Sequence, residues 1–79
     1  MKVQFFSQLK EIVGASEITL DLPDGASVAD LITRLYRDFP GLEKWDRNLL
    51  VGAGLEFVGR DHVIAPNDQI AIMPPVQGG

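Results

Sequence analysis

The feature that most constrains the fold is one run of apolar residues at helical spacing near the middle of the chain. These residues stand at i, i+3, i+4, i+7, i+8 and i+11, which places their side chains on one face of an α-helix: Val28, Leu31, Ile32, Leu35, Tyr36 and Phe39. Ser27 and Asp30 form the pattern of a capping box at the start of this run. Pro40 ends the run, because proline disfavours the α conformation in the residue before it. The sequence therefore predicts one long helix over 28–39.

The segments on either side of this helix show the alternation and the turn residues of β-strands. Strands are predicted at 3–6, 18–22, 49–51, 55–58 and 69–73. A short helix over 9–13 follows the first strand and can end at Gly14. A chain of 79 residues has room for one domain, so we predict an α+β fold in which a mixed sheet packs on one long helix plus a short helix. The order of the strands does not follow from this pattern.

Composition argues against several kinds of site. Seven Lys and Arg against eleven Asp and Glu give a net charge of -4, and the cations are scattered, so nucleic acid is not an expected partner. The chain has no cysteine and one histidine, His62, so we expect no metal site. The carboxylates at turns and strand ends are expected to aid solvation and turn formation, without neighbours that perturb their acidity: Asp21, Asp24, Asp46, Asp61 and Asp68.

The hydropathy pattern bears on location. The first residues become polar too early for a signal-peptide core, and the longest apolar run, 49–55, is far too short to span a bilayer. We therefore expect no membrane partner and a cytoplasmic location.

The end of the chain differs in kind from the rest. Two prolines follow the last predicted strand; they lack the amide hydrogen that a sheet ladder needs, and they favour an extended backbone. The final two glycines have no Cβ, so they form the least bulky peptide that could enter a narrow tunnel in another protein. A frayed end is the alternative, but the stiff prolines lower the entropy lost on insertion and argue against it. We therefore predict a domain at 1–73 and an extended tail made of Pro74, Pro75, Val76, Gln77, Gly78 and Gly79.

Three stretches carry a resemblance to a known family. They are 5–14, the turn into the long helix at 22–28, and the ending 68–79 with its Pro-Pro-Val-Gln-Gly-Gly sequence. Over essentially its whole length the chain resembles the small sulfur-carrier subunits of molybdopterin synthase, in the MoaD/ThiS ubiquitin-like family. The resemblance implies a β-grasp fold, with the first and last strands side by side and the long helix across the sheet.

The resemblance also implies a mechanism centred on Gly79. An adenylating, E1-like enzyme would use ATP to convert the terminal carboxylate into an acyl-adenylate, and a sulfur donor would turn that into a thiocarboxylate. The large subunit of molybdopterin synthase would then accept the tail and use its sulfur to build the dithiolene of molybdopterin from a pterin precursor. The chain would be no enzyme on its own and would hold no tightly bound cofactor; the adenylate and the thiocarboxylate would be transient covalent states.

Strand parity predicts a patch where those partners could dock. Phe6 and Met73 alternate with residues expected to face the helix, so their side chains should lie on the outer face of the sheet near the tail. The alternative is that the loop containing Trp45, or the curvature of the sheet, covers Phe6 and Met73. Periodicity alone does not decide between the two. The resemblance implies that Phe57 belongs to the same patch and that the patch docks both the large subunit and the adenylating enzyme.

The sequence departs from the family pattern at two positions. Gly54 stands where an asparagine is common, which puts in doubt any contact that the asparagine makes. The segment 65–68 replaces a usual Asp-Gly-Asp turn, and we expect Asn67 to adopt the positive φ of that glycine.

Other functions remain open on the sequence. The same tail chemistry would serve sulfur delivery to thiamine or to a tRNA base. A protein modifier whose tail ends on a partner's lysine is a further alternative, and so is an interaction domain with an inert tail.

Overall fold

The computed structural model describes residues 1–75 of the chain. Its elements, in chain order, are β1 (Lys2–Phe5), α1 (Gln8–Val13), β2 (Glu17–Thr19), α2 (Val28–Asp38), η1 (Pro40–Asn48), β3 (Leu50–Ala53), β4 (Glu56–Val58) and β5 (Ile70–Met73). The predicted order of strands and helices is confirmed, with small differences at the ends. The first strand stops at Phe5, and β2 ends at Thr19, three residues earlier than expected, as the chain turns away from the sheet before Pro23.

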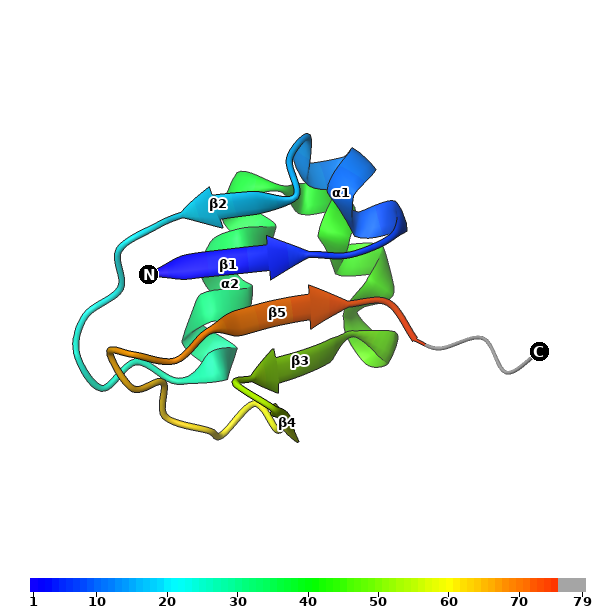
Figure 1. The fold of residues 1–79 in the computed structure, drawn as a ribbon. Helices are drawn as coiled ribbons and strands as arrows, with labels where there is room; N and C mark the ends of the chain where they lie inside the picture. Colours follow the sequence, from blue (N-terminus) through cyan, green and yellow to red (C-terminus); the bar gives the residue numbers. More distant parts are fainter. Residues whose placement is uncertain (76–79) are drawn as a thin grey trace.

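The five strands form one mixed sheet in the order β2-β1-β5-β3-β4. β1 and β5 run parallel, with Val3 opposite Ile70 and Phe5 opposite Ile72, whereas the other pairs are antiparallel. The helices lie on one side of this sheet, behind it in Figure 1, and the side toward the viewer carries no helix. This arrangement confirms the predicted α+β fold with the first and last strands side by side.

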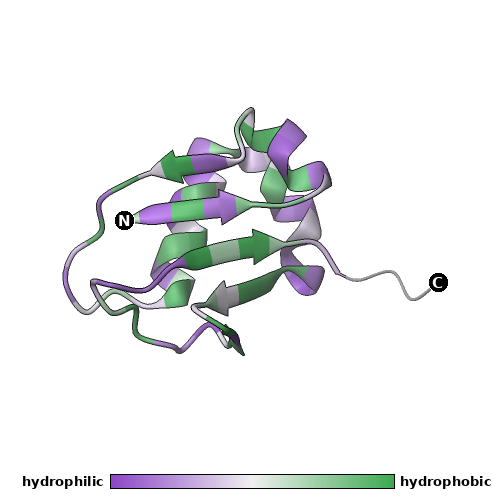
Figure 2. Ribbon diagram, viewed as in Figure 1, coloured by the Kyte–Doolittle hydropathy of each residue, from purple (hydrophilic) through white to green (hydrophobic). Residues whose placement is uncertain are grey.

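The core lies between α2 and the inner face of the sheet. The helix contributes the predicted apolar stripe, of which Val28, Leu31, Ile32 and Leu35 are buried. Alternate strand residues meet that stripe, which is why β1 changes between hydrophilic and hydrophobic along its length in Figure 2. The buried members of the core on the strands are Val3, Phe5, Val51, Ile70 and Ile72.

The start of α2 is held by the capping box that the sequence predicts. The Asp30 backbone N–H donates to Ser27 Oγ at 3.2 Å, and the Ser27 backbone N–H donates to Asp30 Oδ2 at 2.9 Å. Each side chain thus satisfies a backbone donor that the first helical turn leaves free.

We expect Ser27→Ala to lower the free energy of unfolding by about 1 kcal/mol, the usual cost of losing an N-cap hydroxyl. Chemical denaturation followed by circular dichroism measures this change. Ser16→Ala is the matched control, since Ser16 is exposed and lies outside any helix. An equal loss in both variants would contradict a specific role for the cap.

The segment between α2 and β3 differs from its prediction. The sequence predicts a loop that contains Trp45 here, but Pro40–Asn48 forms the 3₁₀ helix η1, which packs Leu42 fully into the core. Leu42 and Trp45 stand three residues apart, the period of a 3₁₀ helix, and this spacing was the signal in the sequence. η1 lies at the end of the sheet where β5 leads into the tail (Figure 1).

Candidate functional site

The tail begins at a hollow beside the end of β5. Pro74 and Pro75 are half-buried, and they form part of an open hollow of about 660 Å³. Its other lining residues come from the end of β1, the start of α1, η1 and β5: Phe6, Ser7, Gln8, Trp45 and Met73. Four of the predicted tail residues, Val76, Gln77, Gly78 and Gly79, lie outside the described residues, so their proposed chemistry stays a prediction.

The predicted patch residues all lie on the outer face of the sheet. Phe5 and Ile72 are opposite each other and buried, so the next residues, Phe6 and Met73, turn outward. Phe6 stays beside β5, since its backbone N–H donates to the Ile72 carbonyl at 3.2 Å. Phe57 reaches the same face through its pairing with Gly52 on β3.

The two readings of Phe6 and Met73 that the sequence left open both describe part of the arrangement. Trp45 does flank these residues in the hollow, yet Phe6 is still 43% exposed and Phe57 is 68% exposed. Trp45 therefore forms a wall beside Phe6 without covering it, while Met73 is half-buried. A docking role for Phe6, Phe57 and Met73 remains a prediction.

Gly52 is a feature of this face that the sequence analysis missed. It lies between Phe57 on β4 and Ala71 on β5, and a Cβ at this position would come within 3.5 Å of Met73 Cε. A second, smaller hollow of about 130 Å³ opens here, next to a fully exposed Leu55. A glycine inside a strand often marks the close approach of another group, and that was the available signal.

The two departures from the family pattern have different outcomes. Gly54 has φ +65 at the turn between β3 and β4, a left-handed conformation that asparagine also tolerates, so the exchange preserves the turn. The expectation for Asn67 is wrong, because among residues 1–75 the only non-glycine residue with positive φ is Ser7. The turn closes without a left-handed residue: the Asp68 backbone N–H donates to the Ala65 carbonyl at 3.0 Å, and the Ala65 backbone N–H donates to Asp68 Oδ2 at 2.8 Å.

Two carboxylates also differ from the expectation that none has a perturbed acidity. The Ala65 N–H, and then His62 at 3.1 Å, hold the pKa of Asp68 below its ordinary value. Hydrogen bonds from Tyr36, and then from Arg60, lower the pKa of Asp46. Both effects come from residues distant in sequence or from backbone groups, which a one-dimensional pattern does not reveal.

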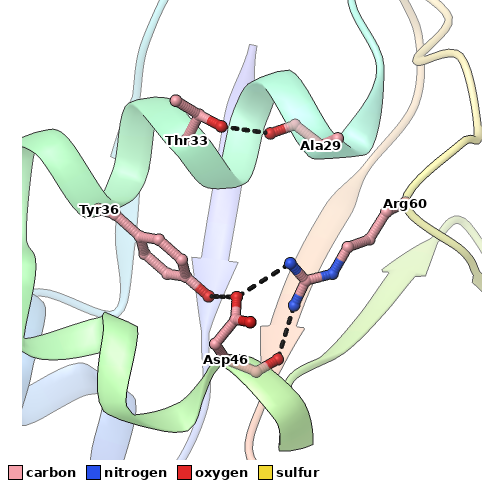
Figure 3. Close-up of polar contacts among 5 residues, drawn as sticks. All are labelled: Ala29, Thr33, Tyr36, Asp46 and Arg60. Atoms are coloured by element: carbon pink, nitrogen blue, oxygen red, sulfur yellow. Dashed lines mark hydrogen bonds and ion pairs between the residues drawn. The ribbon is translucent and has the colours of Figure 1, made fainter.

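The contacts of Asp46 join three segments (Figure 3). Asp46 Oδ1 accepts from Tyr36 Oη of α2 at 2.5 Å and lies 2.9 Å from Arg60 Nη1. Arg60 Nη2 also donates to the Asp46 backbone carbonyl at 2.6 Å. Burial, and then the hydrogen bond to Asp46 and its charge, raise the pKa of Tyr36 to about 12 from its ordinary value of 10.0.

We expect the Tyr36 hydroxyl of the folded protein to titrate near pH 12. Because folding raises the pKa of Tyr36, the protonated hydroxyl stabilises the folded state. This stabilisation is fully present below about pH 10 and is lost as the pH rises through about 12. Tyr36 is the only tyrosine, so the ultraviolet absorbance of phenolate reports it alone, with circular dichroism as the check that the protein is folded.

Asp46→Ala should lower this titration midpoint, whereas Asp38→Ala, which removes the partner of Arg34 on α2, should leave it unchanged. A midpoint at the ordinary tyrosine value in the folded wild-type protein would contradict the arrangement.

The described residues offer little other chemistry. Within 1–75, no group of three or more His, Asp or Glu side chains could hold a metal ion. None of the helices in this part of the chain is long and apolar enough to cross a membrane. The strongest candidate site is therefore the outer face beside the root of the tail.

Comparison with known proteins identifies the family. The ThiS family matches residues 3–79, which is nearly the whole chain and includes the terminal glycines. The chain belongs to the ThiS family. This result agrees with the resemblance found in the sequence.

Individual relatives extend along the full length of the chain. The molybdopterin synthase sulfur carrier subunit of Dictyostelium discoideum is 36% identical over 81 residues, covering 99% of this chain and 94% of that protein. The protein of the same name from Escherichia coli (strain K12) is 33% identical, covering 100% of this chain and 99% of its own length. The crystal structure of SAMP1 from Haloferax volcanii, small archaeal modifier protein 1, superimposes with a TM-score of 0.81 at 25% identity, covering 99% of this chain and 97% of SAMP1. The fold is the ubiquitin-like β-grasp.

Proposed function

We propose that the chain is the sulfur-carrier small subunit of a molybdopterin synthase, which donates sulfur from a thiocarboxylate at Gly79 to a pterin precursor. The observation that carries this proposal is a family match that runs through the last residue, together with two relatives of that name covered over nearly their whole length. Under this proposal the chain is no enzyme by itself. It acts as the sulfur-carrying part of a complex.

The terminal carboxylate needs activation before it can accept sulfur, because a carboxylate oxygen is a poor leaving group. In the proposed sequence a Gly79 oxygen attacks the α-phosphate of ATP on an adenylating, E1-like enzyme, and pyrophosphate leaves. A sulfur nucleophile then attacks the carbonyl carbon and AMP leaves, so that one oxygen is replaced by sulfur. No tightly bound cofactor is needed, since both states are covalent and transient. We place the reaction in the cytoplasm, where ATP is available.

The outer face supports the docking half of the proposal. Phe6, Met73 and the half-buried Pro74 and Pro75 together line the hollow at the root of the tail. A partner that covers this apolar surface would receive the tail at the same time. We propose that the large synthase subunit and the adenylating enzyme both bind here, in turn, because both must reach Gly79.

Intact-mass measurement tests the function. The chain is incubated with an adenylating enzyme of its own source, ATP and a sulfur source, and we expect a gain equal to the replacement of one oxygen by sulfur, located at Gly79 by fragmentation. Omission of ATP is the control and should abolish the gain. The enzyme preparation is first shown to be active on another carrier protein. If the mass of the wild-type chain then stays unchanged with that preparation, the proposal is overturned.

The similarity to SAMP1 favours one alternative, a protein modifier. In that case the same incubation, with cell extract added, should yield an adduct in which Gly79 is joined to a lysine of another protein. Sulfur transfer to thiamine or to a tRNA base would give the same thiocarboxylate. Reconstitution with the large subunit and the pterin precursor separates these cases, because only the proposed function yields a dithiolene.

A further inference from the structure

Tyr36, Asp46 and Arg60 form a polar network next to the tail hollow, the hollow of about 660 Å³ at the root of the tail. Trp45, the neighbour of Asp46 in the chain, lines that hollow together with Phe6 and Met73. It is the only tryptophan of the protein and packs, half-buried, against the core. Among the described residues its indole Nε1 is buried without a hydrogen-bond partner, and a buried donor left unpaired is unfavourable. The position of the indole is therefore not set by a hydrogen bond of its own and depends on what holds the segment around it.

That segment is a weak element by itself. A 3₁₀ helix has poorer hydrogen-bond geometry than an α-helix, and runs longer than about four residues are uncommon, yet η1 covers nine residues. Its inner side is anchored by Leu42, which is fully buried. Near its end, where Trp45 lies, the polar anchor is Asp46.

Asp46 is held at both its side chain and its backbone. Tyr36 and Arg60 bind the carboxylate, and Arg60 also binds the Asp46 carbonyl at 2.6 Å. Arg60 in turn is tied to α2, since its own backbone carbonyl accepts from the Ala29 N–H at 2.9 Å. Figure 3 shows Tyr36, from α2, and Arg60 reaching Asp46 from two directions. The end of η1 is thus connected to α2 at two residues, directly at Tyr36 and through Arg60 at Ala29. These two residues are about two helical turns apart.

We propose that Asp46, held by Tyr36 and Arg60, is a positioning residue that sets Trp45 as a fixed wall of the tail hollow and thereby tunes the binding of the partner that receives the tail. The docking part of this inference rests on the proposed sulfur-carrier function. The placement of Trp45 does not. The network is peripheral, with side chains of Asp46 and Arg60 that are 43% and 45% exposed, and exposed ion pairs contribute little to global stability. Its removal should therefore loosen Trp45 while the fold persists.

The experiment compares Asp46→Ala with Asp38→Ala. The control removes a carboxylate of similar side-chain exposure, 36%, that also pairs with an arginine, at 3.0 Å, but that does not line the hollow. Two quantities are measured: the quenching of Trp45 fluorescence by acrylamide, and the Kd for the large subunit of molybdopterin synthase from titration. Thermal unfolding shows whether each variant is folded at the temperature used.

We expect Asp46→Ala to make Trp45 at least about twofold more quenchable and to weaken partner binding about fivefold, equivalent to about 1 kcal/mol. Tyr36→Phe, which deletes only the 2.5 Å hydrogen bond, should move both quantities in the same direction by less, and it replaces Asp46→Ala if the latter does not fold. Asp38→Ala should change neither. A merely structural role would lower the unfolding temperature without changing quenching in the folded protein.

Unchanged quenching in a folded Asp46→Ala variant would overturn the positioning of Trp45. Increased quenching with an unchanged Kd would overturn its effect on docking. If wild-type protein failed to bind the large subunit, the sulfur-carrier proposal and the docking part would fall together, and the quenching comparison would still decide the placement of Trp45. The two failures are therefore distinguishable.

Discussion

A variant with one alanine added after Gly79 should lose sulfur loading almost completely. The new carboxylate would lie about 3.5 Å further along an extended chain, and misplacement of a reacting atom by about 1 Å already costs about a hundredfold in rate. We therefore expect the rate of adenylation to fall by at least about a hundredfold. The measurement is the carrier-dependent exchange of labelled pyrophosphate into ATP. Deletion of Gly79 should fail for the opposite reason, because its carboxylate is too short to reach the nucleotide.

Docking provides the control for this prediction. The described domain is unchanged by an addition at the terminus, so binding of the extended variant to the adenylating enzyme should remain within a few-fold of wild type. Activation of the extended variant at the wild-type rate would show that Gly79 is not the reacting residue.

Phe6→Asp should weaken binding to the large synthase subunit by more than about thirtyfold. Truncation of a residue at the buried centre of an interface typically costs more than about 2 kcal/mol of binding free energy. Phe6 is 43% exposed and lines the hollow at the tail root, so a carboxylate there should be tolerated by the free protein and desolvated in the complex. Titration calorimetry measures the loss, and circular dichroism tests the fold.

Gln4→Asp is the matched control for this substitution. Gln4 is exposed on the outer face two residues earlier on β1, opposite Glu17 and Ala71, and it is not among the residues that line the hollow. The same charge at this position should change the Kd by less than about threefold. Equal losses in the two variants would indicate a general charge effect, and no loss in either would remove Phe6 from the interface.

The parts of the fold that sequence reasoning predicted well are those that depend on near neighbours in the chain. The 28–39 stripe, the Ser27–Asp30 cap and the end of α1 at Gly14 each involve residues within a few positions of one another, and each is present in the structure. The outward direction of Phe6 and Met73 followed from strand parity for the same reason. η1 was missed because a 3₁₀ helix offers only a short, weak pattern. The expectation for Asn67 was wrong because the Asp68 backbone and side chain both bond to Ala65 and close the turn without a left-handed residue.

What the sequence by itself determined about this protein is therefore its five strands and two α-helices, its helix-facing residues and the glycine terminus that points to a carrier. Only the tertiary structure decided the strand order β2-β1-β5-β3-β4, the smaller hollow at Gly52, and the contacts among Tyr36, Asp46 and Arg60. The physical reason is that local propensities and caps act over one turn of helix or one strand. Apart from the β3–β4 pair, the strand pairings join residues at least 13 positions apart, and the Asp46 contacts join residues 10 and 14 positions apart. The packing of the whole core selects these pairings.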